Sequence, residues 1–375
     1  MSTILILATV QAFFLSALTI AKKNKLFADK VLALWLVLLG LHLLVNIIYA
    51  ELIFQNFIVL NLSAGFPYLQ GPLLYIYVRS LALQQARMKA SDSLHFVPFA
   101  LYVVYQWLVL NSYSHSPTSE HINVHFFAQS MYFNILLLAS VPLYIMLSIK
   151  LLMRYQKIIS NNFSSLEKIN LNWLKYLLFG LAVVWLVVII EFILYEAGQQ
   201  SHTIFISITL FLYAVGYLGL TQTTVFSNLF IYNEKIVTIN STGNQEQENT
   251  HKKYKNSGLS KDQAQLKKNE LLEYMQNFKP FLDEQITLFK LATQLDMSSH
   301  HLSQLINDQC QQNFFDFING YRIEEVKRRL KSSEFDDQSL LVIAFDAGFA
   351  SKSSFNRLFK KSTGLTPSQF RKDKN

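Results

Sequence analysis

The charged residues are divided unevenly along this chain of 375 residues, and that division constrains its fold more than any other feature. Residues 1–225 hold 12 of the 33 Lys and Arg and 7 of the 25 Asp and Glu, whereas residues 226–375 hold the other 21 and 18. The two parts therefore carry 19 charges in 225 residues and 39 in 150. A soluble domain has about 25% charged residues. The charged fraction of the first part is far below this value, which indicates a lipid environment, whereas that of the second part is close to it, which indicates an aqueous environment.

Seven apolar stretches occur in the first part, at about residues 2–21, 31–54, 57–78, 94–110, 124–149, 173–195 and 203–225. A helix rises 1.5 Å per residue, so about 20 residues cross a hydrocarbon layer of about 30 Å. Six stretches meet this length, the fourth is close to the lower limit, and the third is interrupted by Gly and Pro residues. We predict a seven-helix transmembrane bundle over residues 1–225.

The basic residues between these stretches alternate from one connection to the next. The first, third and fifth connections contain the basic residues Lys22, Lys23, Lys25, Lys30, Arg79, Arg87, Lys89, Lys150, Arg154, Lys157 and Lys168. The other connections, around residues 55–56, 111–123 and 196–202, contain no Lys or Arg. The positive-inside rule then predicts an N-terminus outside and a C-terminal domain in the cytoplasm. A retained first helix is favoured over a cleaved signal peptide, because its basic cluster follows the apolar run.

Residues 226–262 lie between the predicted transmembrane bundle and the domain at residues 263–375. Residues 239–262 are rich in Asn, Gln, Ser, Lys and Glu, a composition that buries no core and predicts a flexible polar linker. About 24 such residues span roughly 25–30 Å, so the domain at 263–375 is expected to stay close to the membrane.

Two similar patterns in the second part predict a repeated helix-turn-helix. In TLFKLATQLDMSSHHLSQLIND, a short apolar face is followed by Asp296-Met297 at a turn, by Ser298 as an N-cap, and by a buried stripe of Leu302, Leu305 and Ile306. In SLLVIAFDAGFASKSSFNRLFKKSTG, the matching positions are Gly348 at the turn, Ser351 as the N-cap, and a stripe of Phe355, Leu358 and Phe359.

The segment FFDFINGYRIEEVKRRL, between the two patterns, predicts a linker helix over about 314–331. Its core-facing residues are Phe315, Ile318, Ile323, Val326 and Leu330. Such a helix is roughly 26 Å long. It would separate the two recognition helices so that they enter successive major-groove faces of DNA, which lie about 34 Å apart.

Residues 263–375 resemble the AraC-type DNA-binding domain. The segments that carry the resemblance are HLSQLIN, FFDFINGYRIEEVKRRL and IAFDAGFASKSSFNRLFKKSTGLTPSQFR. The matching positions in the last segment are Gly348-Phe349, Ser354-Phe355, Phe359-Lys360, Gly364, Pro367 and Phe370-Arg371. The first part, including QGPLLYIYV, is similar to the front end of membrane-embedded members of that family. The predicted fold is therefore all-α, a transmembrane bundle followed by a cytoplasmic domain with two helix-turn-helix motifs.

The resemblance implies that both recognition helices contact double-stranded promoter DNA. Opposite the buried stripes lie His300, Ser303 and Gln304 on the first helix and Lys352, Ser353, Asn356 and Arg357 on the second. Arginine suits guanine, and Gln or Asn suits adenine, while Lys360 is expected at phosphate. The alternative is that these are solvated polar residues. The basic run Lys327-Arg328-Arg329-Lys331 also has two possible interpretations. It forms either a phosphate-binding patch or ion pairs with Glu324 and Glu325 of the same helix.

No cofactor, metal site or catalytic function is predicted. The lone Cys310 excludes a disulfide framework within the chain, and the adjacent His300 and His301 point about 100° apart on a helix. No paired carboxylate, nucleophile motif or phosphate-binding Gly loop occurs. Residues 263–375 hold 16 basic and 14 acidic residues, a net charge of +2, and this weak electrostatic attraction to DNA favours a homodimer.

Polar residues inside the apolar stretches are candidates for a signal pocket, because intramembrane polar groups are costly. They are His42, Asn46, Gln70 and Glu191. The alternative is hydrogen bonding between helices, with Glu191 reaching the outer surface.

The sequence thus predicts a multi-pass protein of the bacterial inner membrane, with membrane lipid and DNA as partners. It would couple an unknown small-molecule or membrane signal to promoter binding. The alternative is a membrane transporter or sensor whose helix-turn-helix domain is a protein-interaction module.

Overall fold

The structure is a computed structural model that describes residues 2–23, 25–52, 63–83, 87–113, 119–167, 169, 171–194, 203–221 and 261–373. Within these residues every regular element is helical, and the one β feature is an isolated bridge between Phe163 and Thr287. The all-α prediction is confirmed. Internal contacts divide the chain into two units, Met1–Met153 with Leu171–Glu234 and Arg154–Asn170 with Lys235–Asn375.

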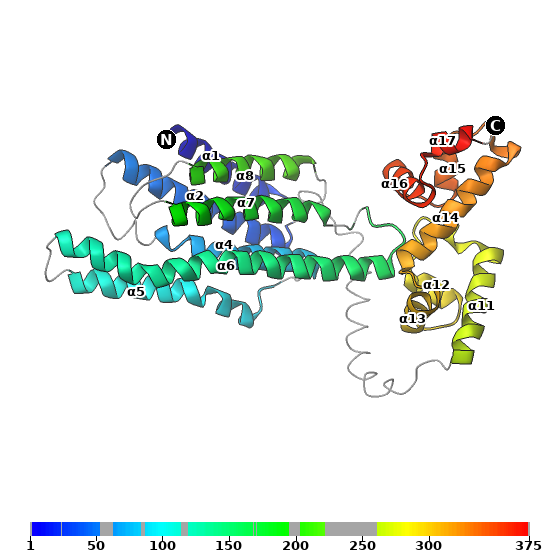
Figure 1. The fold of residues 1–375 in the computed structure, drawn as a ribbon, viewed down its shortest axis with the longest axis horizontal. Helices are drawn as coiled ribbons and strands as arrows, with labels where there is room; N and C mark the ends of the chain where they lie inside the picture. Colours follow the sequence, from blue (N-terminus) through cyan, green and yellow to red (C-terminus); the bar gives the residue numbers. More distant parts are fainter. Residues whose placement is uncertain are drawn as a thin grey trace. The chain divides into compact units, whose positions relative to one another are not determined.

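The first unit consists of long apolar helices (Figure 1). Its elements are α1 (Ser2–Ala21), α2 (Phe27–Leu52), α4 (Pro67–Ala82), the 3-10 helix η1 (Ala90–Phe96), α5 (Val97–Tyr113), α6 (Ser119–Asn162, whose last residues belong to the second unit), α7 (Asn172–Leu194) and α8 (Thr203–Thr221). A described helix overlaps each predicted apolar stretch. Whether there are seven membrane crossings stays a prediction.

Four segments of the described chain are long and apolar enough to cross a membrane, and these are Thr3–Ala21, Phe27–Ile48, Phe133–Asn162 and Asn172–Leu194. Thr203–Tyr217 is a shorter apolar helix. Only 28% of the Asn172–Leu194 window is buried, and Phe179 and Ile193 are 71% and 73% exposed. Many large apolar side chains are exposed along these helices, as expected for a surface that faces lipid and not water.

Two ion pairs hold the connections between these helices. Lys22 Nζ lies 3.1 Å from Asp29 Oδ2, and both side chains are nearly buried. Arg79, in the last turn of α4, donates from Nη1 to Asp92 Oδ1 at 2.7 Å and pairs with the second carboxylate oxygen through Nη2. In the sequence, Lys22 and Arg79 indicate only topology, whereas the structure also gives them a packing role.

The described helices of the second unit follow the predicted pattern of two motifs around one long helix. They are α11 (Lys261–Phe278), η2 (Pro280–Leu282), α12 (Leu288–Gln294), α13 (Ser299–Cys310), α14 (Phe314–Lys331), η3 (Ser333–Phe335), α15 (Leu340–Asp346), α16 (Lys352–Thr363) and α17 (Pro367–Lys372). Helices α12 and α13 form the first motif, and α15 and α16 form the second. The predicted linker helix, residues 314–331, is α14.

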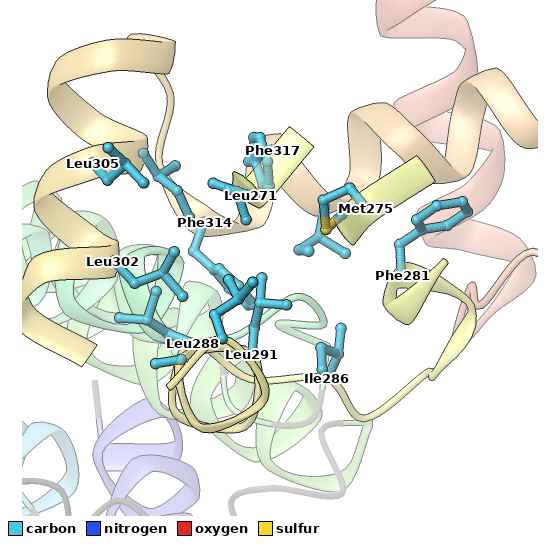
Figure 2. Close-up of a cluster of buried hydrophobic side chains, with 14 of the residues drawn as sticks. Leu271, Met275, Phe281, Ile286, Leu288, Leu291, Leu302, Leu305, Phe314 and Phe317 are labelled. Atoms are coloured by element: carbon cyan, nitrogen blue, oxygen red, sulfur yellow. The ribbon is translucent and has the colours of Figure 1, made fainter. Parts of the chain in front are cut away.

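Helix α14 contributes to two separate hydrophobic clusters. Its start, with Phe314, Phe317 and Ile318, packs into the first cluster together with side chains from α11, α12 and α13, as Figure 2 shows for Phe314 and Phe317. Phe315, Ile323, Val326 and Leu330 belong to the second cluster, which they share with α15 and α16. The five core positions predicted for this helix are all buried. Each motif therefore has its own core, and α14 joins the two.

The second unit also includes residues 154–170, which are the last turns of α6 and part of its connection to α7. The division at residues 225 and 262 stays a prediction, because most of the predicted linker, residues 226–260, lies outside the described residues.

Candidate nucleic-acid interface

The first helix-turn-helix forms as predicted from its turn and cap residues. Asp296, at the end of α12, has a φ of 49°, which turns the chain between the two helices. Ser298 is the N-cap of α13, and its hydroxyl accepts a hydrogen bond from the His301 backbone N–H at 3.2 Å. Such a cap stabilises a helix by about 1 kcal/mol. Leu302, Leu305 and Ile306 are fully buried, so the opposite face of α13 is left to solvent.

The second helix-turn-helix repeats this arrangement with different residues. Gly348 has a φ of 93°, and Ser351 is the N-cap of α16, accepting from the Ser354 N–H at 3.2 Å. Phe355, Leu358 and Phe359 are buried, as predicted. The polar face of α16, opposite these three side chains, therefore lies on the surface.

The side chains predicted to contact DNA lie on these polar faces. His300 and Gln304 on α13 are exposed and Ser303 is half-buried, while Lys352, Ser353, Asn356, Arg357 and Lys360 on α16 are exposed. Four of the α16 residues also line an open hollow of about 580 Å³, together with three residues around the start of α17. The lining residues are Ser353, Asn356, Arg357, Lys360, Thr366, Pro367 and Ser368. That these residues contact DNA stays a prediction.

The start of α17 is a part of this surface that was not predicted from the sequence. Thr366 caps α17, accepting from the Gln369 N–H at 3.3 Å while Gln369 Oε1 accepts from the Thr366 N–H at 3.0 Å. This reciprocal pair follows the Thr-x-x-Gln pattern of TPSQ, with Pro367 at the first helical position. The pattern is typical of a helix start, and only the fold brings that start beside Arg357 and Lys360.

Three of the four basic residues of the run on α14 pair with acidic residues of the same helix. Lys327 Nζ lies 2.8 Å from Glu324 Oε1, Arg328 Nη2 lies 2.7 Å from Glu325 Oε1, and Arg329 Nε lies 2.8 Å from the same oxygen. Hydrogen bonds from Arg328 and Arg329 lower the pKa of Glu325 to about 2. These contacts favour intrahelical pairing over the phosphate patch that the sequence left open.

Arg322, which the sequence analysis did not select, is the most deeply buried charged residue of this unit among those described. Its Nε donates to the Phe281 carbonyl at 2.8 Å and its Nη2 to the Asp283 carbonyl at 2.9 Å. Its Nη1 donates to Asn319 Oδ1 at 3.2 Å and to the Ser164 carbonyl at 3.3 Å. Burial lowers its pKa to about 10, so the guanidinium stays charged at neutral pH. The Arg-Ile-Glu-Glu pattern gave no signal of this role.

The four residues of the predicted signal pocket lie in the first unit. His42 Nδ1 lies 2.9 Å from the Ser63 carbonyl, Trp35 Nε1 donates to Gln70 Oε1, and Asn46 Nδ2 donates to the His42 carbonyl at 2.8 Å. Glu191 on α7 is buried. These contacts place His42 and Gln70 where α2 meets α4, and they favour the alternative of hydrogen bonding between and within helices. A pocket stays a prediction.

Comparison with known proteins adds an independent observation. The sequence profile of a family described as a helix-turn-helix domain matches residues 291–373, which contain α13 to α17 with most of α12. The C-terminal region is an AraC-type helix-turn-helix domain. The membrane-type helices of the first unit lie outside that match.

Relatives with regulator names share only part of their length with this chain. An uncharacterised helix-turn-helix-type transcriptional regulator of Staphylococcus aureus strain COL is 35% identical over 91 residues, covering 24% of this chain and 12% of the relative. The melibiose operon regulatory protein of Escherichia coli K12 is 30% identical over 90 residues, covering 24% of this chain and 29% of that protein. The chain thus spans less than a third of the length of either relative.

A solved structure of a protein of unknown function from Listeria innocua is 28% identical. The match covers 28% of this chain and 94% of that one, with a TM-score of 0.25.

Proposed function

We propose that this protein is a membrane-bound, sequence-specific DNA-binding transcription regulator. The observation that carries the proposal is the AraC-type domain whose second recognition helix exposes Asn356, Arg357 and Lys360 beside one hollow. Regulator names of partial relatives support it. Arg357 reads guanine, Gln304 and Asn356 read adenine, and Lys360 binds phosphate. His300, Ser303, Lys352 and Ser353 complete the proposed contact surface.

The apolar helices anchor this domain at the bacterial inner membrane, in contact with lipid, with the N-terminus outside and residues 263–375 in the cytoplasm. The exposed apolar surface of α7 and the basic residues of alternate connections support this placement. Two copies are proposed to act together, because a net charge of +2 gives one domain little attraction for DNA. A small molecule or a membrane property is the proposed signal.

Genome-wide crosslinking of the tagged full-length protein tests the proposal and names its target sites. A duplex from the strongest site is then titrated with full-length protein in lipid nanodiscs. Arg357→Ala is expected to weaken binding by 1–3 kcal/mol, about 5- to 150-fold, and to relax the sequence preference at one position. Lys360→Ala is expected to weaken all sequences alike and to reduce the salt dependence.

Lys267→Ala is the matched control, because it removes the same charge from α11, where Lys267 pairs with Glu270. Sequence-selective binding that survives Arg357→Ala and Gln304→Ala together would contradict the proposed contacts. Crosslinking without any enriched sites would favour the protein-interaction alternative.

A further inference from the structure

Residues 163–167, which follow the end of α6, are built into the second unit. Phe163 forms an antiparallel bridge with Thr287, the N-cap residue of α12, and its side chain is buried. The Ser164 hydroxyl donates to the Ile286 carbonyl at 2.8 Å and accepts from Arg322 Nη2 at 3.2 Å. The Ser164 carbonyl accepts from Asn319 Nδ2 at 2.9 Å. Because buried polar groups need partners, Arg322 and Asn319 of α14 hold this segment against the domain through these hydrogen bonds.

The same segment continues to the second helix-turn-helix. Leu166 packs against the hydrophobic cluster of α14, α15 and α16. The Glu167 carboxylate accepts a hydrogen bond from the Ser351 hydroxyl, and its Oε1 accepts from the Ser353 hydroxyl at 3.1 Å. Ser351 is the N-cap of α16, and Ser353 lines the hollow that contains Arg357. A carboxylate thus lies at the N-terminal end of the recognition helix, at the edge of the proposed DNA surface.

This carboxylate occupies a position that suits a DNA phosphate. Helix N-termini bind anions through unpaired N–H groups and the helix dipole, and Ser hydroxyls are common donors to phosphate. Glu167 takes two hydroxyl donors at that end of α16 and adds a negative charge that repels the DNA backbone. While Glu167 is bound there, it competes with a DNA phosphate for the Ser351 and Ser353 hydroxyls at the start of α16.

We propose that residues 163–167 form an inhibitory segment, which holds α16 in a state of low DNA affinity until Glu167 is released. This inference rests on the proposed DNA-binding function and names its regulation. The segment lies in sequence between α6 and α7, so a change in the packing of these helices acts on it directly. Coupling of this kind is reciprocal. Release of the segment therefore raises DNA affinity, and bound DNA releases the segment.

The first test compares Glu167→Ala with the full-length wild type in nanodiscs, on a duplex from the crosslinking experiment. The variant is expected to bind roughly tenfold more tightly, within the range of about 5- to 150-fold that is typical of such coupling. Glu273→Ala is the control, because it removes the same charge from an exposed position on α11. Equal affinities of the wild type and Glu167→Ala overturn the inference and leave the proposed function standing. No binding by either protein overturns both.

The second test measures hydrogen exchange of the wild-type segment with and without saturating DNA. Exchange of the amides of residues 165–169 is expected to increase when DNA binds, while the core of α14 stays protected. Unchanged or stronger protection of the segment in the DNA complex overturns the inference, even where Glu167→Ala alters affinity.

Discussion

At the scale of single residues, backbone conformation decides which positions of the C-terminal unit tolerate change. Gly348 and Gly364 both have positive φ, 93° and 77°. Their surroundings differ. A Cβ on Gly348 would lie 2.4 Å from the Phe281 carbonyl oxygen and 2.9 Å from that of Leu282, whereas a Cβ on Gly364 would meet nothing within 4 Å. Gly348 is therefore required both by its φ and by the close approach of another backbone.

Gly348→Ala is expected to lower the free energy of unfolding of this unit by about 3 kcal/mol. A left-handed residue with a Cβ costs about 1–2 kcal/mol, and the displaced backbone adds to that. Gly364→Ala carries only the first cost and serves as the control. Pulse proteolysis of the full chain in urea measures both. Equal losses for the two variants would show that the contact with residues 281–282 does not form.

At the scale of elements, α14 determines how the two motifs are joined. Its apolar side chains enter both hydrophobic clusters, Arg322 ties it to residues 281–283 and 164, and its charged residues pair along its exposed face. Glu325 is the centre of that pairing, with contacts to Arg328 and Arg329 and with Lys279 Nζ 3.6 Å away. The helix is thus held by apolar contacts, by buried hydrogen bonds and by ion pairs, so its charged residues have a structural role.

The lowered pKa of Glu325 makes the stability of this element depend on pH. The folded pKa is about 2 and the ordinary value is 4.5, so the ionised carboxylate stabilises the fold fully above pH 4.5. This contribution is lost as the pH falls from 4.5 to 2. Glu325→Gln is expected to cost about 2 kcal/mol at pH 7, which allows for partial screening by solvent, and almost nothing near pH 2.

Pulse proteolysis with thermolysin at pH 7 and pepsin at low pH measures this difference in the full chain. Glu324→Gln is the control, since Glu324 forms a single ion pair and its side chain is 65% exposed. Glu324→Gln should cost less than about 1 kcal/mol at either pH. A Glu325→Gln defect that does not change with pH would rule out this titration as its cause.

At the scale of the whole molecule, one chain combines two kinds of surface. The helices of the first unit expose large apolar side chains, whereas the C-terminal unit exposes charged residues at the frequency of a soluble domain. Each surface is stable only in its own solvent, because transfer of apolar area to water costs about 25 cal/mol per Å². The proposed orientation in the membrane rests on the basic residues of alternate connections.

Reporter fusions test that orientation. Alkaline phosphatase, which is active only outside the cytoplasm, is expected to be active when fused after residue 115 or 199 and inactive after residue 86, 160 or 375. Green fluorescent protein fused at the same points should show the opposite pattern. Two neighbouring connections that report the same side would contradict the seven-helix topology.

Much of this protein was determined by the sequence alone, because the signals are local. The period of Leu302, Leu305 and Ile306, the cap residues Ser298 and Ser351, and the positive-φ residue Gly348 act within one or two turns of chain. The hydrogen bonds and backbone angles that these residues supply involve only neighbouring residues. Both motifs and the linker helix 314–331 were therefore predicted within a residue or two. The apolar stretches are predictable for the same reason.

The tertiary structure decided what depends on residues far apart in sequence. The sequence around Arg322 does not distinguish this residue from an exposed polar residue of a helix. Only the folded structure buries it among the carbonyl groups of residues 281, 283 and 164. Glu167 lies in the connection between two apolar stretches, and folding brings it to Ser351 and Ser353, more than 180 residues away. A hydrogen bond across that separation leaves no period in the sequence, because its geometry is set by the packing of every element between the two partners.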